Sequence, residues 1–197
     1  MFDVDVVINW LVERAKRTPY YHLDGYMLRH WLVPYRTVVK RKLPQQPGDY
    51  DIGSWDGVYP EPFETADGTG PVSPWRRPIA WLLQRFDISV RVHEILRSDI
   101  GNDSHDHPFN YLTIILRGGY FEQVFDDDGE LISQHWHGPG SVLWRPKKTW
   151  HRLDVPEGTS TWTLFITDKK ENGVWGYNVA GKKVNHRDHD TFKHFHG

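Results

Sequence analysis

The chain contains no cysteine among its 197 residues. This absence excludes structural disulfides, thiolate-bound zinc, iron–sulfur clusters and a cysteine nucleophile. Any metal ion that the protein holds must therefore be bound by nitrogen and oxygen atoms.

Long apolar runs and a large excess of one charge are also missing. No stretch of about 18 consecutive apolar residues occurs, so a membrane-spanning helix is not expected. The first residues, MFDVDVVINW, lack the basic region and the cleavage site of a secretory signal, and we expect a cytoplasmic location. A formal net charge of -2 predicts no general attraction to nucleic acid or to anionic lipid. The expected partner is a small-molecule substrate.

What is present favours one domain, because 197 residues with 38% hydrophobic content bury one substantial core. Within residues 1–20, apolar residues at helical spacing predict a helix over 4–17 that Pro19 ends. Residues 34–78 contain eight prolines and five glycines, which predicts a long loop-rich connector. This connector is either a loose insertion or, through its aromatic residues, a lid that packs over a pocket.

Short runs of β-forming residues, separated by turn sequences such as Gly118-Gly119, fill residues 79–180. Many short strands without helices between them predict an all-β sandwich or barrel. Residues 181–197 are predicted to be a polar, histidine-rich tail that could bind metal adventitiously. The predicted strands are 79–86, 88–96, 111–117, 120–125, 131–137, 141–145, 150–155, 160–167 and 174–179.

Twelve histidines provide the candidate chemistry, and the pattern His-x-His occurs three times. Residues two apart on a strand point to the same face, so each pair could offer two imidazoles to one ion. The pairs are His105/His107, His135/His137 and His194/His196. For the second pair, exposure at a barrel rim is the simplest interpretation.

Only the first pair is accompanied by a wider pattern. The run HDHPFNY at residues 105–111, followed by Gly118, resembles the first motif of the cupin superfamily. Gly140, Pro146 and His151 resemble the second motif, in the expected order and at a normal separation. Several further stretches are similar to cupin-like proteins of bacteria and phages, a likeness that implies no particular substrate. The resemblance implies a single cupin domain, which is a double-stranded β-helix or jelly-roll barrel.

The resemblance also implies that His105, His107 and His151 bind a divalent metal ion. The glutamate that usually adds a fourth ligand is replaced by Tyr111, and an inner glycine of the second motif is Lys148. The site left behind is similar to the three-histidine sites of thiol dioxygenases and of some diketone- and gentisate-type oxygenases. These imply Fe(II) as the first expectation, with Zn, Ni or Mn as further possibilities. The alternative is a purely structural role, in which the histidines form a hydrogen-bonded group in the core of a barrel without metal.

Three further residues are candidates for catalytic work. Tyr111 shares the strand face of the missing glutamate and either orients substrate or packs as a core aromatic. Arg91 and His93 share one face of their predicted strand, where they would serve as an anion clamp and a base if that face is interior. The opposite orientation would place both in solvent. Asp106, between the two histidines, is expected to be structural, whereas Arg117 and Thr113 share the face of Tyr111.

Three functions are consistent with these residues. The first is a mononuclear non-haem Fe(II) dioxygenase that acts on a small molecule. The second is an isomerase, epimerase or lyase for a sugar or small acid, with a histidine as base and Tyr111 as acid. The third is a ligand-binding cupin without catalysis. The resemblance further implies a homodimer as a possible assembly.

Overall fold

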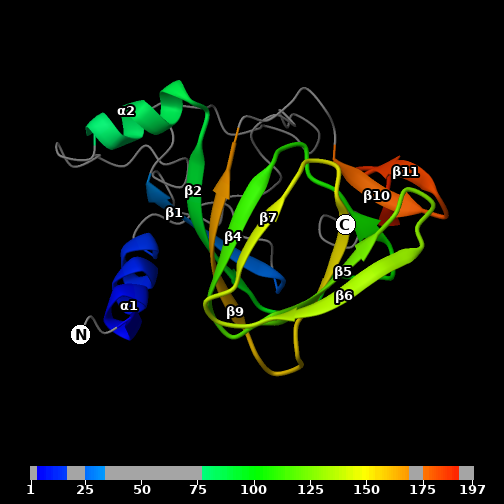
Figure 1. Ribbon diagram of the computed structural model, residues 1–197, viewed down its shortest axis with the longest axis horizontal. Coiled ribbons are helices and arrows are strands. Elements are labelled where there is room, and N and C mark those ends of the chain that lie inside the picture. The colour runs from blue at the N-terminus through cyan, green and yellow to red at the C-terminus, as the bar shows by residue number, and fades with distance from the viewer. Residues whose placement is uncertain (1–3, 17–24, 34–76, 169–174, 191–197) are drawn as a thin grey trace.

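The computed structural model describes residues 4–16, 25–33, 77–168 and 175–190. Two helices and eleven strands lie in these ranges (Figure 1). The elements are α1 (Val4–Ala15), β1 (Met27–Val33), α2 (Arg77–Arg85), β2 (Ser89–Ile95), β3 (Ser104–His105), β4 (Tyr111–Arg117), β5 (Tyr120–Phe125), β6 (Leu131–His137), β7 (Val142–Arg145), β8 (Trp150–Asp154), β9 (Thr161–Thr167), β10 (Gly176–Val179) and β11 (Lys182–Asn185).

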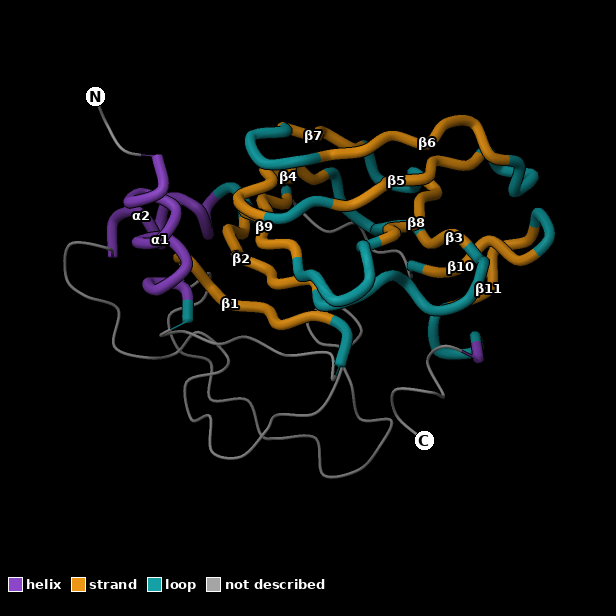
Figure 2. Tube along the Cα trace, turned by 90° about the horizontal axis from the view of Figure 1, so that it is seen from below, coloured by secondary structure: helices purple, strands orange, loops and turns teal. Residues whose placement is uncertain are grey.

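The strands form two antiparallel sheets, one with the order β1-β2-β9-β4-β7 and one with the order β11-β10-β3-β8-β5-β6. Within them, β2-β9-β4-β7 faces β3-β8-β5-β6, and this crossing of eight strands between two layers is the strand order of a jelly roll. Figure 2 shows the two layers, with α1 and α2 at one end of the molecule. The expected all-β, cupin-type jelly roll is confirmed.

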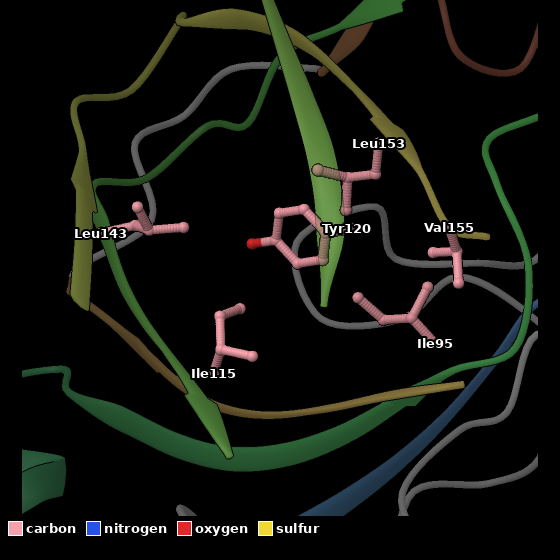
Figure 3. Packing of buried hydrophobic residues seen from close by; sticks show 6 residues of the cluster. All are labelled: Ile95, Ile115, Tyr120, Leu143, Leu153 and Val155. Atoms are coloured by element: carbon pink, nitrogen blue, oxygen red, sulfur yellow. The ribbon is translucent and has the colours of Figure 1, made fainter. Parts of the chain in front are cut away.

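Apolar side chains from both sheets fill one part of the interior. Because side chains alternate along a strand, every second residue of these strands points inward. Five such residues and Val155, which directly follows β8, converge on one central space and form what we call the barrel floor (Figure 3). The floor consists of Ile95, Ile115, Tyr120, Leu143, Leu153 and Val155.

Helix α1 covers the outer face of the first sheet. Val12 and Ala15 are buried against Val92 and Leu116, whose side chains point away from the barrel interior. Strand β2 is thus buried on both faces, by α1 on one side and by the barrel on the other. The predicted N-terminal helix is confirmed over the part that the structure describes.

All eight strands predicted from residue 88 onward are found, and β4, β5 and β6 have the predicted bounds. The predicted strand 79–86 is wrong, because this segment is helix α2. Its apolar residues recur at helical spacing, and Pro78 stands in the first turn, where a helix tolerates proline.

The sheets also extend beyond residues 79–180. Strand β1 pairs with β2, and β11 pairs with β10 inside the segment predicted to be a polar tail. His186, just after β11, is 3% exposed and stacks on Trp175, so this part of the predicted tail is packed. The predicted connector lies outside the described residues except for its last two positions, which begin α2.

No helix in the described ranges is both long enough and apolar enough to cross a bilayer.

Candidate metal centre

Strands β3 and β8, together with the loop after β3, bring together the three histidines expected to bind metal. His105 on β3 lies directly opposite His151 on β8, and His107 follows β3 by two residues. The ring centroids are 4.5 Å apart for His105 and His151, 5.1 Å for His105 and His107, and 5.2 Å for His107 and His151. One ring nitrogen from each residue lies within 4.8 Å of the other two. We call these three residues the histidine cluster.

The surroundings of the histidine cluster favour neutral imidazoles. Burial lowers the pKa of His105 to about 4, although nearby Asp99 opposes the shift. Burial and the neighbouring His105 and His151 place the pKa of His107 well below its usual value. Near neutral pH, both rings therefore keep a lone pair that can bind a cation.

Tyr111, at the start of β4, points into the barrel as its strand parity predicts. Its hydroxyl lies 3.3 Å from both ring nitrogens of His151, and its ring meets that of His107 edge to face. Burial, followed by the charge of Glu122, raises the pKa of Tyr111 well above its usual value. A neutral phenol is thus held against the histidine cluster.

Arg91 and His93 lie on the interior face of β2, as one of the two predicted orientations required. His93 stacks on Phe165 at a centroid distance of 4.7 Å, and Phe165 lies 6.5 Å from His107. The guanidinium of Arg91 lies 5.6 Å above the same Phe165 ring and donates a 3.0 Å hydrogen bond to Ser89. The Phe165 ring therefore lies between these two side chains and the histidine cluster.

Two buried carboxylates beside the cluster were missed by the sequence analysis. Glu122 Oε1 on β5 lies 3.1 Å from His151 Nδ1, and Asp99 Oδ2 lies 3.5 Å from His105 Nδ1. Burial by itself raises the pKa of Glu122, but hydrogen bonds from His151 and Arg145 outweigh it and hold the pKa at about 2. The alternation of Tyr120, Glu122 and Val124 was the available signal, because it places a carboxylate on the inward face of a predicted strand.

The remaining candidates have structural contacts. Asp106 is structural as expected, since its carboxylate accepts hydrogen bonds from the Gly176 backbone and from Lys183. Thr113 is buried within β4. The expectation that Arg117 shares the face of Tyr111 is wrong, because a register shift before Arg117 breaks the alternation of β4 and directs its guanidinium to Asn9 on α1.

The predicted rim position of the second histidine pair is partly correct. His135 is exposed, whereas His137 is half-buried and lies 3.3 Å from Glu122 Oε2. This pair is absent from the group of clustered ligand atoms found among the described residues.

The histidine cluster fits a divalent metal ion. Its donors are three imidazole nitrogens, which suit Fe, Zn, Ni and Mn, and two of the three side chains are buried. Metal–nitrogen bonds of about 2.1 Å join nitrogens that are less than about 4.2 Å apart. The ligand atoms of the cluster, which all lie within 4.8 Å of one another, are close to that spacing.

Fold and site together define a cupin-type jelly roll whose interior holds a three-histidine cluster suited to a divalent metal ion. No protein-family model matches the chain, and no curated protein matches it in sequence.

Solved structures match parts of the chain. The polyketide cyclase RemF from Streptomyces resistomycificus is 16% identical over 44% of this chain and 57% of its own, with a TM-score of 0.36. Hydroxypropylphosphonic acid epoxidase from S. wedmorenis is 14% identical over 42% of this chain and 43% of its own, with a TM-score of 0.34. A cupin superfamily protein from Desulfitobacterium hafniense is 17% identical over 41% of this chain and 66% of its own, with a TM-score of 0.32. In each case the match spans less than two thirds of the other protein's length.

Proposed function

We propose that the protein is a mononuclear non-haem Fe(II) dioxygenase that acts on a small molecule. The observation that supports this proposal is the convergence of His105, His107 and His151, three neutral ligands without a carboxylate among them. When bound to three protein nitrogens, iron has further coordination positions at which a chelating substrate and oxygen can meet.

The neighbouring residues supply binding and orientation in this proposal. The Tyr111 hydroxyl, 3.3 Å from His151, donates a hydrogen bond to a substrate atom bound next to the cluster. Arg91 attracts an acidic group of the substrate, and His93, whose pKa burial and Arg91 keep low, remains a neutral base or acceptor beside it. Phe165 lies between these two residues and the cluster and packs against the apolar part of the substrate.

Oxygen uptake tests the proposal. Metal-free protein is loaded anaerobically with Fe(II), and oxygen consumption is followed with candidate thiols and diketones. The proposal expects uptake that requires both iron and substrate and that is lost in His151→Ala. Zinc- and nickel-loaded protein serve as controls. Absence of iron-dependent uptake across a broad panel of such substrates would overturn the dioxygenase assignment and leave the metal site standing.

A second candidate is an isomerase, epimerase or lyase for a sugar or small acid. The close approach of the Tyr111 hydroxyl to His151 favours it, because a phenol and an imidazole at 3.3 Å can serve as an acid–base pair. Turnover without oxygen separates this candidate from the first. Tight binding of a small acid without turnover would instead identify a ligand-binding protein.

A further inference from the structure

The two histidines that face each other across β3 and β8 each have a buried carboxylate behind the ring. Glu122 lies at Nδ1 of His151, and Asp99 lies at Nδ1 of His105. In both rings the carboxylate lies beside Nδ1, which leaves Nε2 for an ion.

Glu122 is fixed from several sides. Its side chain is 2% exposed, Arg145 donates to both of its oxygens, and His137 Nε2 lies 3.3 Å from Oε2. A carboxylate held by a guanidinium through two hydrogen bonds has little freedom to rotate. Oε1 thus remains 3.1 Å from His151 Nδ1, where it accepts a proton that this nitrogen carries.

Asp99 is fixed by neutral donors. Tyr26 donates its hydroxyl proton to Oδ1, and the Leu153 backbone amide donates to Oδ2 at 2.7 Å. Leu153 belongs to β8, two residues after His151, so the strand that carries one histidine also orients the carboxylate behind the other. The 3.5 Å separation from His105 makes this contact the weaker of the two.

We propose that Glu122 and Asp99 are positioning residues, which hold His151 and His105 in the Nδ1–H tautomer and aim Nε2 of both rings at the metal. The inference rests on the metal site of the proposed function and not on its reaction. Carboxylates in this role fix the ring orientation and make the imidazole a stronger ligand, and their loss weakens metal binding by about 10–100-fold.

The arrangement also supplies charge to a site whose ligands are neutral. Tyr111 occupies the position where the resembled family carries a ligand glutamate, so the cluster itself offers a divalent ion no negative charge. Asp99 and Glu122 place carboxylates beside the histidines, on the side of each ring away from the proposed ion. Arg145 balances the charge of Glu122, whereas the Tyr26 hydroxyl and the Leu153 amide that donate to Asp99 are uncharged groups.

Metal titration of Glu122→Gln tests the inference. Zn²⁺ affinity of the tag-free, metal-free protein is measured by calorimetry, and Co²⁺ absorption reports the ligand set. Glu130→Gln, which makes the same chemical change on an exposed turn, serves as the control. Arg145→Gln keeps the Glu122 carboxylate but removes the two hydrogen bonds that hold it, so its effect separates the carboxylate from the ion pair. Nitrogen NMR of His151 reads its tautomer directly in the metal-free protein.

The inference predicts at least about tenfold weaker zinc binding in Glu122→Gln and less than about threefold change in Glu130→Gln. Arg145→Gln and Asp99→Asn are each expected to have a smaller effect than Glu122→Gln. The inference also predicts Nδ1–H at His151 in the wild-type protein and a different tautomer balance in Glu122→Gln. Unchanged affinity in Glu122→Gln, or equal losses in Glu122→Gln and Arg145→Gln, would overturn it. The inference would also be overturned if the Co²⁺ spectrum of Glu122→Gln showed one oxygen ligand fewer than that of the wild-type protein, since Glu122 would then bind the metal itself. If His151→Ala keeps wild-type affinity, the metal site itself fails, which is a distinguishable result.

Discussion

The hydroxyl of Tyr111 can be removed to test catalysis without removing a metal ligand. Its oxygen contacts His151, while its ring packs beside His107 and Phe165. Tyr111→Phe keeps the ring and removes only the proton donor. We expect unchanged metal content and a loss of about 100-fold or more in the rate of substrate-dependent oxygen uptake, in the range typical of a proton donor.

A matched control for this change is Tyr120→Phe, which deletes a buried hydroxyl in the barrel floor. We expect Tyr120→Phe to retain most of the uptake rate. Equal rates in wild-type protein and Tyr111→Phe would show that Tyr111 is a packing residue.

His93 makes the stability of the metal-free protein depend on pH. Burial, followed by the charges of Arg91 and Arg29, places its pKa well below 6.5 in the folded state, whereas the unfolded chain has the ordinary value. Below about pH 6.5 the unfolded state therefore binds a proton that the folded state does not bind, and the free energy of unfolding falls as pH falls. Each such histidine contributes at most about 1.4 kcal/mol per pH unit.

Urea unfolding between about pH 7.5 and pH 5 measures this dependence. His93→Phe is expected to reduce the slope, because one of the buried histidines no longer titrates in the unfolded state. The variant keeps an aromatic ring against Phe165. Identical slopes in both proteins would contradict the neutral, buried state of His93.

The residues of the histidine cluster could be predicted from sequence, but their supporting carboxylates could not. His105, His107 and His151 belong to two spaced motifs, and spacing survives in a linear sequence. Glu122 reaches His151 only because β5 pairs with β8, and this pairing is a property of the whole sheet. Alternation in the sequence shows which face of a strand a residue lies on, but it does not show which strand lies next to it.

At the scale of elements, α1 stabilises the jelly roll by covering the outer face of β2. Val12 is 3% exposed, whereas Val7 on the same helix is 47% exposed. Val12→Ala is expected to lower the free energy of unfolding by about 1–3 kcal/mol, because it leaves a void against Val92. Val7→Ala makes the same change in solvent and is expected to alter it by less than about 0.5 kcal/mol.

Chemical denaturation of the two valine variants checks this prediction. Both substitutions replace valine with a better helix former, so helix propensity affects both in the same direction. Similar losses in the two variants would mean that α1 is not docked as described.

The errors at this scale have physical causes. The predicted strand 79–86 is helix α2, because its apolar residues recur at helical spacing. Strand β3 has two residues, too few for any periodic pattern, and β11 is polar because it is an edge strand with exposed lysines. Longer strands such as β4 and β9 alternate clearly and are predicted well.

At the scale of the whole molecule, the jelly roll explains how histidines 46 positions apart in sequence become direct neighbours, since β3 pairs with β8. An ion that binds this assembled site, and not the unfolded chain, stabilises the fold. At a free metal concentration of about 100 times Kd, the gain is about 2.7 kcal/mol. For a chain of this size we expect a rise in Tm of about 5–10 °C.

Thermal unfolding with and without Zn²⁺ measures this shift. His107→Ala is expected to abolish most of it, since the substitution removes a ligand from a half-buried position. A shift of the same size in His107→Ala would place the stabilising ion elsewhere on the chain.

The most direct test of the central claim, that three imidazoles share one ion, is elemental analysis of tag-free protein beside His151→Ala. A variant with His194 and His196 replaced by alanine controls for adventitious binding near the C-terminus. We expect one divalent ion per chain in the wild-type protein and in this control, and almost none in His151→Ala. An equal metal content in wild-type protein and His151→Ala would contradict a site shared by the three imidazoles.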